Sequence, residues 1–140
     1  LMRNPELLER IVARVKGVSK VPVTVKIRSG WDYSSINAVD VAKRCADAGV
    51  DAVIVHPRTR SQGFGDLSDW SVIRSIRENI NVPVVGSGDI NTPDDAMRMK
   101  AETGIDYVMV GRGAMGNPWI FRQITERFKG KDVSEPLLTV

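Results

Sequence analysis

The chain has 140 residues, of which 42% are hydrophobic and 26% are charged, and this composition excludes a disordered or fibrous protein. Its formal charge of +3 permits a polyanionic partner without requiring one. The single cysteine excludes a disulfide framework, and no apolar run approaches the roughly 20 residues of a membrane span. We therefore expect a protein of the cytoplasm with no membrane segment.

Helical and strand patterns alternate along the chain. A first helix is predicted from the N-cap residue Asn4, with Pro5 at its first position, to Gly17. The other expected elements are the strands 21–28, 51–56, 82–86 and 107–110 and the helices 36–48, 71–79, 93–102 and one that begins at Pro118. Strands that alternate with helices predict an α/β fold of βα units around a parallel sheet.

Two stretches of the sequence occur twice. The tripeptide 21–23 recurs at 82–84, and the pattern of residues 46–55 recurs at 101–110. Repeated parallel βα units point to the eight-stranded TIM barrel, of which four strands form half. Because a complete barrel takes about 250 residues, we expect this chain to be part of a longer protein.

Polar residues gather where the predicted strands end. All strands of a parallel βα sheet end at the same rim, where ligands bind, so these residues predict one binding site. For each residue taken alone, the alternative is that strand ends are polar because they meet water. The side chains and turns concerned are Lys26, Arg28, His56, Arg58, 87–89 and 111–113.

Two glycine-rich turns, 86–90 and 111–118, are the most informative feature of this rim. Glycines let backbone N–H groups approach an oxyanion, and the loops after the last two strands are the usual phosphate cradle of a TIM barrel. Arg112 can add a charge-assisted contact, and Asn117 can cap the helix at Pro118. The alternative is that the glycines only make tight turns.

Lys26 and His56 are the side chains of greatest chemical interest. A lysine in an apolar strand is costly unless its ammonium reaches a partner or a cleft, so Lys26 reaches either a ligand or the solvent. In a flavin barrel that ligand would be the electron-rich edge of the flavin ring. His56 is the only histidine, which excludes a multi-histidine metal site, and we predict no metal. It serves either as a hydrogen-bonding partner of a ring or base or as a structural histidine. Cys45 is expected in the core.

The loop 58–64 carries Arg58, Arg60 and the aromatic Phe64. Such a set suits an RNA phosphate backbone and a stacked unpaired base, although it is also typical of an ordinary solvated loop. Asp69 is expected to cap the next helix and Trp70 to pack against the barrel, without a functional role for either.

Five motifs that occur in this order closely resemble those of the tRNA-dihydrouridine synthases, flavin enzymes that reduce selected uridines in tRNA. The resemblance covers nearly the whole chain. It implies that residues 1–128 form the C-terminal half of an FMN-binding TIM barrel, strands five to eight, and that 129–140 lead to a helical RNA-binding domain. The motifs are Lys26-Ile-Arg-Ser-Gly-Trp-Asp32, His56-Pro-Arg-Thr-Arg-Ser-Gln62, Asp69-Trp70, Ser87-Gly-Asp-Ile90 and Gly111-Arg-Gly-Ala-Met-Gly-Asn-Pro-Trp119.

The resemblance also implies roles for single residues. Lys26 should contact the flavin ring, and His56 should lie beside the ring and the target base. The residues implied to hold the ribityl phosphate are Ser87, Gly88, Asp89, Gly111 and Arg112. The residues implied to face the RNA are Arg28, Arg58 and Arg60. The full enzyme would take hydride from NADPH onto FMN and pass it to a uridine flipped out of its stack.

The sequence departs from the family pattern in three places. Ser87 stands where the family usually has asparagine, which removes an amide from the cofactor site. Pro57 stands where it often has glycine, which stiffens the turn after His56. The family's general-acid cysteine belongs to an earlier Gly-Cys-Pro motif that this chain lacks, so no catalytic residue is predicted within it. We expect the chain alone neither to reduce uridine nor to hold FMN tightly.

Three other functions fit parts of the pattern. The chain could be half of another FMN-dependent oxidoreductase, half of a non-redox phosphate-binding barrel enzyme, or a non-catalytic remnant that binds RNA or a partner. The segments 58–62 and 116–119 argue against the first, and a yellow chromophore bleached by NADPH would exclude the second. The missing acid favours the third. A half-barrel also leaves two sheet edges unpaired, through which we expect self-association.

Overall fold

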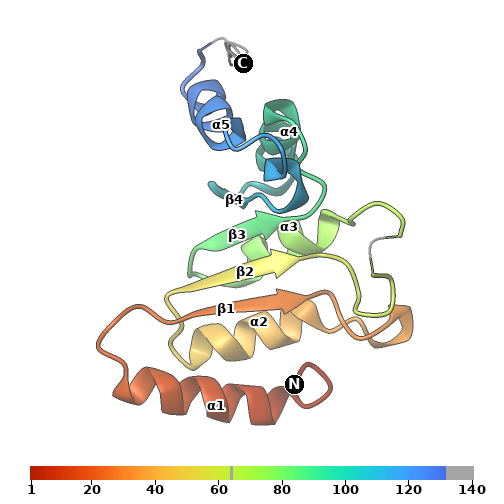
Figure 1. Ribbon diagram of the computed structural model, residues 1–140. Helices are drawn as coiled ribbons and strands as arrows, with labels where there is room; N and C mark the ends of the chain where they lie inside the picture. Colours follow the sequence, from red (N-terminus) through yellow and green to blue (C-terminus); the bar gives the residue numbers. More distant parts are fainter. Residues whose placement is uncertain (64, 132–140) are drawn as a thin grey trace.

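The computed structural model describes residues 1–63 and 65–131. Its centre is a parallel sheet whose strands lie in sequence order: β1 (Thr24–Arg28), β2 (Ala52–His56), β3 (Val84–Ser87) and β4 (Tyr107–Met109). The strands alternate with helices α1 (Pro5–Val18), α2 (Ala38–Asp47), α3 (Ser71–Asn79), α4 (Pro93–Thr103) and α5 (Ile120–Phe128) (Figure 1). This order confirms the α/β class and the parallel βα units predicted from the sequence.

Right-handed crossovers between neighbouring parallel strands place all of the connecting helices on one face of the sheet. Helix α2 contacts β1 and β2, α3 contacts β3, and α4 contacts β4, while each helix from α1 to α5 also contacts the next. A row of strands backed by a row of helices is a segment of a βα-barrel wall. Within the described residues, β1 and β4 each pair with one strand only, so both form open edges.

The strand register divides the sheet into a helix-covered face and an open face. Val25 pairs with Val53 and Ile27 with Val55, and these residues belong to the helix-covered face, where Val53 and Val55 are fully buried. Successive side chains of a strand alternate between faces. The open face therefore carries the intervening residues, which include Lys26, Arg28, Ile54, His56, Val85, Ser87 and Tyr107.

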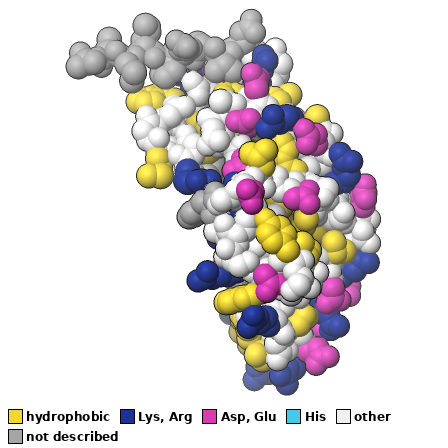
Figure 2. Space-filling view, turned by 90° about the vertical axis from the view of Figure 1, so that its right-hand side faces the viewer, with side chains coloured by type: hydrophobic (Ala, Val, Ile, Leu, Met, Phe, Trp, Pro, Cys, Tyr) yellow, Lys and Arg dark blue, Asp and Glu magenta, His cyan; other side chains and the backbone are white. Residues whose placement is uncertain are grey.

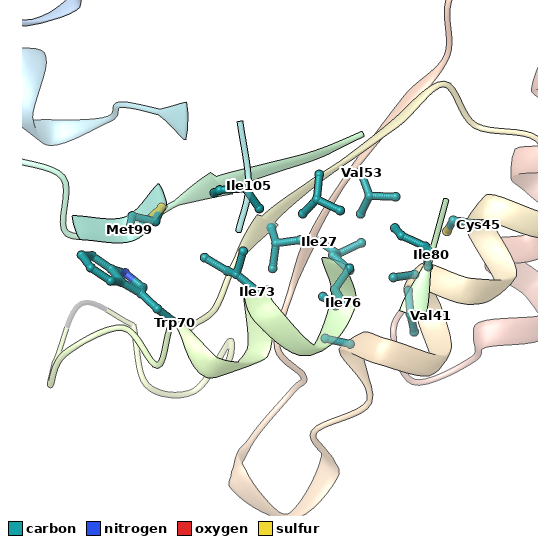
Figure 3. Close-up of a cluster of buried hydrophobic side chains, with 14 of the residues drawn as sticks. Ile27, Val41, Cys45, Val53, Trp70, Ile73, Ile76, Ile80, Met99 and Ile105 are labelled. Atoms are coloured by element: carbon teal, nitrogen blue, oxygen red, sulfur yellow. The ribbon is translucent and has the colours of Figure 1, made fainter. Parts of the chain in front are cut away.

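The hydrophobic core lies between the helix-covered face and the helices. Figure 3 shows the cluster, with Val41 and Cys45 grouped at one end and Trp70 and Met99 at the other. Cys45 is fully buried and Trp70 is 8% exposed, which confirms that both pack in the core as predicted. A Cβ on Gly86 would overlap with the side chains of Ile105, which precedes β4, and Met99 of α4, because this strand residue lies directly against them.

Most predicted elements are found, with differences at their ends. β1 begins at Thr24 and β3 at Val84, after Pro22 and Pro83, because proline has no N–H for the ladder. Asn4 caps α1 as predicted, accepting a hydrogen bond from Leu7 N at 3.0 Å. The Asp69 carboxylate accepts hydrogen bonds from the N–H and hydroxyl of the first residue of α3, but the cap position itself belongs to Trp70.

The prediction that Asn117 caps a helix at Pro118 is wrong. Residues 117–119 form a turn after Gly116, which has a positive φ of 76°, and α5 begins only at Ile120. The Asn117 side chain instead donates to Gln123 Oε1 at 3.4 Å.

Two further expectations concern membrane-spanning helices and the C-terminal segment. None of the helices in the described ranges is long and apolar enough to cross a membrane. Of the segment 129–140, which was predicted to lead to another domain, residues 132–140 lie outside the described residues, as does Phe64.

Candidate functional site

A cavity of about 290 Å³ lies at the carboxyl ends of the strands. Figure 2 looks onto this end of the molecule, since the strand arrows of Figure 1 point toward the side that it shows, and Lys and Arg side chains project at its left margin. Every residue that the sequence predicts as a cofactor contact lines this cavity. These residues are Lys26, His56, Ser87, Gly88, Asp89, Gly111 and Arg112, and Arg28 joins them. Their convergence is as predicted, while the identity of their ligand stays a prediction.

Arg58 and Asp89, the second of which lines the cavity, form a buried ion pair. Arg58 Nη2 donates to the two carboxylate oxygens of Asp89 at 2.7 and 2.9 Å, and the two side chains are 3% and 16% exposed. The expectation that Arg58 faces RNA is therefore wrong, because its guanidinium is turned inward. It also donates to the carbonyl oxygens of Gly65 at 3.3 Å and Asp66 at 2.7 Å within the same loop, so the pair with Asp89 attaches the loop after β2 to the exit of β3.

The Asp89 carboxylate is unsuited to bind a phosphate, because its oxygens accept hydrogen bonds from within the chain. It accepts a third hydrogen bond, from Ser68 N at 2.7 Å. Burial alone would raise its pKa, but the hydrogen bonds from Ser68 and Arg58 outweigh this and hold the pKa below its ordinary value. An ionised carboxylate repels a phosphate, so any contact of Asp89 with such a group has to come from its backbone N–H. Its φ of 57° is in the left-handed region, which aspartate tolerates better than most residues.

His56 is a neutral imidazole at the end of β2. Partial burial, followed by the charges of Arg28, Lys26 and Arg58, lowers the pKa of His56 to about 4, against a small opposing effect of Asp89. Its Nε2 lies 3.4 Å from Arg58 Nη1. At neutral pH the ring therefore adds no charge to the cavity and offers hydrogen bonding instead.

Lys26 and Arg28 form the basic wall of the cavity on β1. Burial of part of its side chain, and then the charge of Arg28, lower the pKa of Lys26 below its ordinary value. Arg28 Nη1 donates to the carbonyl oxygen of Thr59 at 3.0 Å, so this side chain also supports the loop after β2. Both residues project from the open face of the sheet, as the strand alternation requires.

The two glycine turns lie close to each other across the cavity. A Cβ on Gly88, whose φ is 111°, would lie 2.6 Å from Ser68 Oγ and 2.9 Å from His56 Cδ2. A Cβ on Gly113 would overlap with the carbonyl oxygen of Ile90. Both positions thus require glycine for a close approach of backbone. Arg112, with an exposed side chain, lies beside these turns with Nη2 3.7 Å from Asp89 Oδ1.

A second cavity of about 390 Å³ adjoins the first and shares Lys26 and Arg28 with it. It is also lined by Trp31 and Arg60, and the guanidinium carbons of Arg60 and Arg3 lie 5.5 and 4.2 Å from the centre of the Trp31 ring. Among the described residues, three side-chain cations and no carboxylate line this space. The sequence analysis assigned no role to Trp31 or Arg3, although Trp31 belongs to the first motif, because cation–π pairing between distant segments leaves no local pattern.

The donor set at the first cavity suits an anionic cofactor such as FMN. Arg112 and the two glycine turns offer N–H donors to a phosphate, while Lys26 and His56 offer donors to a polar ring. The volume is at the lower end of the range of about 300–1,000 Å³ that is usual for small-molecule sites. The site fits the phosphate end of FMN and one side of its ring. No group of three or more His, Cys, Asp or Glu residues able to hold a metal occurs within 1–63 and 65–131.

A parallel βα wall with a cationic cavity and two glycine turns at the carboxyl ends of its strands defines the ligand-binding face of a βα-barrel protein. A family model described as "Dihydrouridine synthase (Dus)" matches residues 1–139. The chain belongs to this family, which confirms the resemblance noted in its motifs.

Curated relatives agree with this assignment. The chain is 47% identical over 120 residues to a "Probable tRNA-dihydrouridine synthase" of Rhizobium leguminosarum bv. phaseoli, a match that covers 85% of this chain and 38% of the relative. It is 42% identical over 124 residues to "tRNA-dihydrouridine synthase B" of Shewanella oneidensis, covering 89% of this chain and 38% of that protein. The chain thus spans about two fifths of the length of the relatives it matches.

A solved structure supports the fold. The N-acetylmannosamine-6-phosphate 2-epimerase from Clostridium perfringens superposes with a TM-score of 0.56 at 17% identity, over 88% of this chain and 48% of that one. At this identity the likeness concerns the fold alone. Together with the family match, it confirms the prediction of part of a TIM barrel.

Proposed function

We propose that this chain forms the C-terminal half of the barrel, residues 1–128, of a tRNA-dihydrouridine synthase that reduces uridine to 5,6-dihydrouridine in tRNA, with FMN as cofactor and NADPH as reductant, in the cytoplasm. The observation that carries the proposal is the convergence of Lys26, His56 and Arg112 on one cavity at the strand ends. The names of the relatives support the substrate class.

In this proposal the cavity holds the phosphate end of FMN. The residues that would hold the phosphate are Ser87, Gly88, Gly111 and Arg112, while Lys26 and His56 would contact the ring. When bound, FMN would supply the hydride for the C5–C6 bond of uracil. Asp89, which the sequence placed among the phosphate ligands, would act by fixing Arg58 and the loop after β2.

The RNA-facing surface would be the second cavity and its rim. Arg28 and Arg60, which the resemblance implies face the RNA, line this cavity, and Trp31 holds Arg60 and Arg3 by cation–π contact. Guanidinium groups ordered on an aromatic ring suit the phosphates and unstacked bases of single-stranded RNA. The shared side chains of Lys26 and Arg28 would connect the cofactor in the first cavity with an RNA phosphate in the second.

The test of the cofactor site compares FMN with riboflavin, which lacks the phosphate. Both are titrated into the 140-residue chain and into R112A, and affinity is read from NMR shift changes. A hydrogen bond to a charged group is worth roughly 1.5–3 kcal/mol, so we expect R112A to weaken FMN about 10- to 100-fold and to leave riboflavin unchanged. R98A, which removes an exposed arginine on α4, is the control. Equal losses of FMN in R112A and R98A would contradict the proposal.

A further inference from the structure

The contact between His56 and Arg58 determines where the imidazole proton resides. Arg58 Nη1 lies 3.4 Å from His56 Nε2. A guanidinium only donates hydrogen bonds and does not lose its proton in proteins, so Nε2 has to be the acceptor. If Nε2 carried the proton, its N–H would point at the N–H of Arg58 Nη1, and no hydrogen bond would form. The neutral ring therefore carries its proton on Nδ1.

The other edge of the ring leaves Nδ1 available to a ligand. The Cδ2–Nε2 edge lies against Gly88, because a Cβ there would be 2.9 Å from Cδ2 and 3.2 Å from Nε2. Across residues 1–63 and 65–131, no protein group accepts a hydrogen bond from Nδ1. His56 nevertheless lines the cavity at the strand ends. A half-buried N–H without a protein acceptor is a donor for whatever fills that cavity.

Burial and three neighbouring cations together favour the neutral form of His56. Lys26 and Arg28 face it from β1 and Arg58 from the loop after β2, while Asp89 after β3 is the one carboxylate among the described residues that favours the charged form. Asp89 is already paired with Arg58 at 2.7 Å. The pKa of about 4 that results keeps His56 uncharged near pH 7.

We propose that Arg58 is a positioning residue, which orients the neutral His56 ring and holds its proton on Nδ1, so that His56 donates a hydrogen bond to a carbonyl oxygen of the ligand in the cavity. The tautomer follows from contacts within the chain alone. Only the identity of the acceptor, a flavin or a uracil carbonyl, rests on the proposed function. In this state His56 is a hydrogen-bond donor and not a proton acceptor toward the ligand, since its one basic nitrogen is directed at Arg58.

Because the chain has a single histidine, its tautomer can be read without assignment. Long-range ¹H–¹⁵N correlation spectra of the chain labelled with ¹⁵N-histidine distinguish a protonated from an unprotonated ring nitrogen at each position. We expect a protonated Nδ1 and an unprotonated Nε2 at pH 7. A protonated Nε2, or an averaged pair of signals, would overturn the proposal.

The role of Arg58 is tested by replacing its guanidinium with an apolar chain of similar length. In R58M we expect the Nε2–H form to rise to a major population. If R58M does not fold, D89N is compared with R58M/D89N, which removes the buried charge that Arg58 would leave behind. An unchanged tautomer in the folded variant would overturn the assignment to Arg58.

Riboflavin and uridine, titrated separately, identify the acceptor. A change in the Nδ1 signal with riboflavin assigns it to the flavin, and a change with uridine assigns it to the base. If neither ligand changes Nδ1 at concentrations where it shifts other cavity signals, the donor role is wrong while the tautomer stands. If neither ligand shifts any cavity signal, the proposed function fails as well, and the two failures are thereby distinguished.

Discussion

Replacement of Asp89 by asparagine tests how much the fold of the site depends on one buried ion pair. Asparagine is almost identical in shape and tolerates the left-handed backbone of this position, so D89N changes the charge without adding strain. The change leaves the guanidinium of Arg58, which is 3% exposed, without an anion. It also weakens the hydrogen bond from Ser68 N.

The expected cost follows from the burial of the two groups. Removal of one partner from a buried pair costs about 3–5 kcal/mol. The lower end applies, about 3 kcal/mol, because Asp89 is 16% exposed and an amide oxygen still accepts one hydrogen bond. Urea unfolding followed by circular dichroism measures this loss as a lower midpoint at an unchanged slope.

A matched control is the exposed pair of Arg98 and Glu102 on α4, whose side chains are 59% and 50% exposed. The variant E102Q should cost less than about 1 kcal/mol, as exposed pairs do. A loss in D89N no larger than the loss in E102Q would refute the argument that this pair is what attaches the loop to the sheet.

Three other outcomes are expected. The unfolded chain binds more protons than the folded chain between pH 4 and 6.5, because the pKa of His56 is lowered to about 4. The contribution of His56 to the free energy of unfolding is therefore complete above pH 6.5 and decreases by at most about 3 kcal/mol as the pH falls toward 4. In urea unfolding, H56Q should not show this part of the decrease. R60A should weaken tRNA binding and reduce its salt dependence by about one phosphate contact in filter binding, whereas R98A should not. The chain should also self-associate through the open edges of β1 and β4, and a monomer in light scattering at all concentrations would contradict this.

The fold and the gathering of the site residues could be predicted from the sequence because both depend on local patterns. β-Branched runs that alternate with capped helices specify parallel βα units, and this topology alone brings Lys26, His56 and Arg112 to one rim. Which side chains point into the cavity follows from alternation along the strands, since the polar residues of β1 are two apart.

The partner and the burial of each arginine could not be predicted in this way. Arg58 and Arg60 are two residues apart in one loop, yet one is buried against Asp89 and the other lies on Trp31. Their partners are 31 and 29 residues away along the chain, so the path of the loop decides the pairing and composition does not. The prediction that Asn117 caps a helix was wrong by two residues: the chain makes a turn from Asn117 to Ile120, and α5 begins only at Ile120.

The alternation of β1 has a consequence for how this strand can evolve. Lys26 and Arg28 face the cavity while Val25 and Ile27 face the helices, so loss of a single residue within the strand would exchange the two sets. Cations would then enter the core at the same moment as apolar groups replaced them at the rim. The same alternation thus decides both which residues line the cavity and which fill the core. Insertions and deletions that the loops tolerate should therefore be selected against within the five residues of β1.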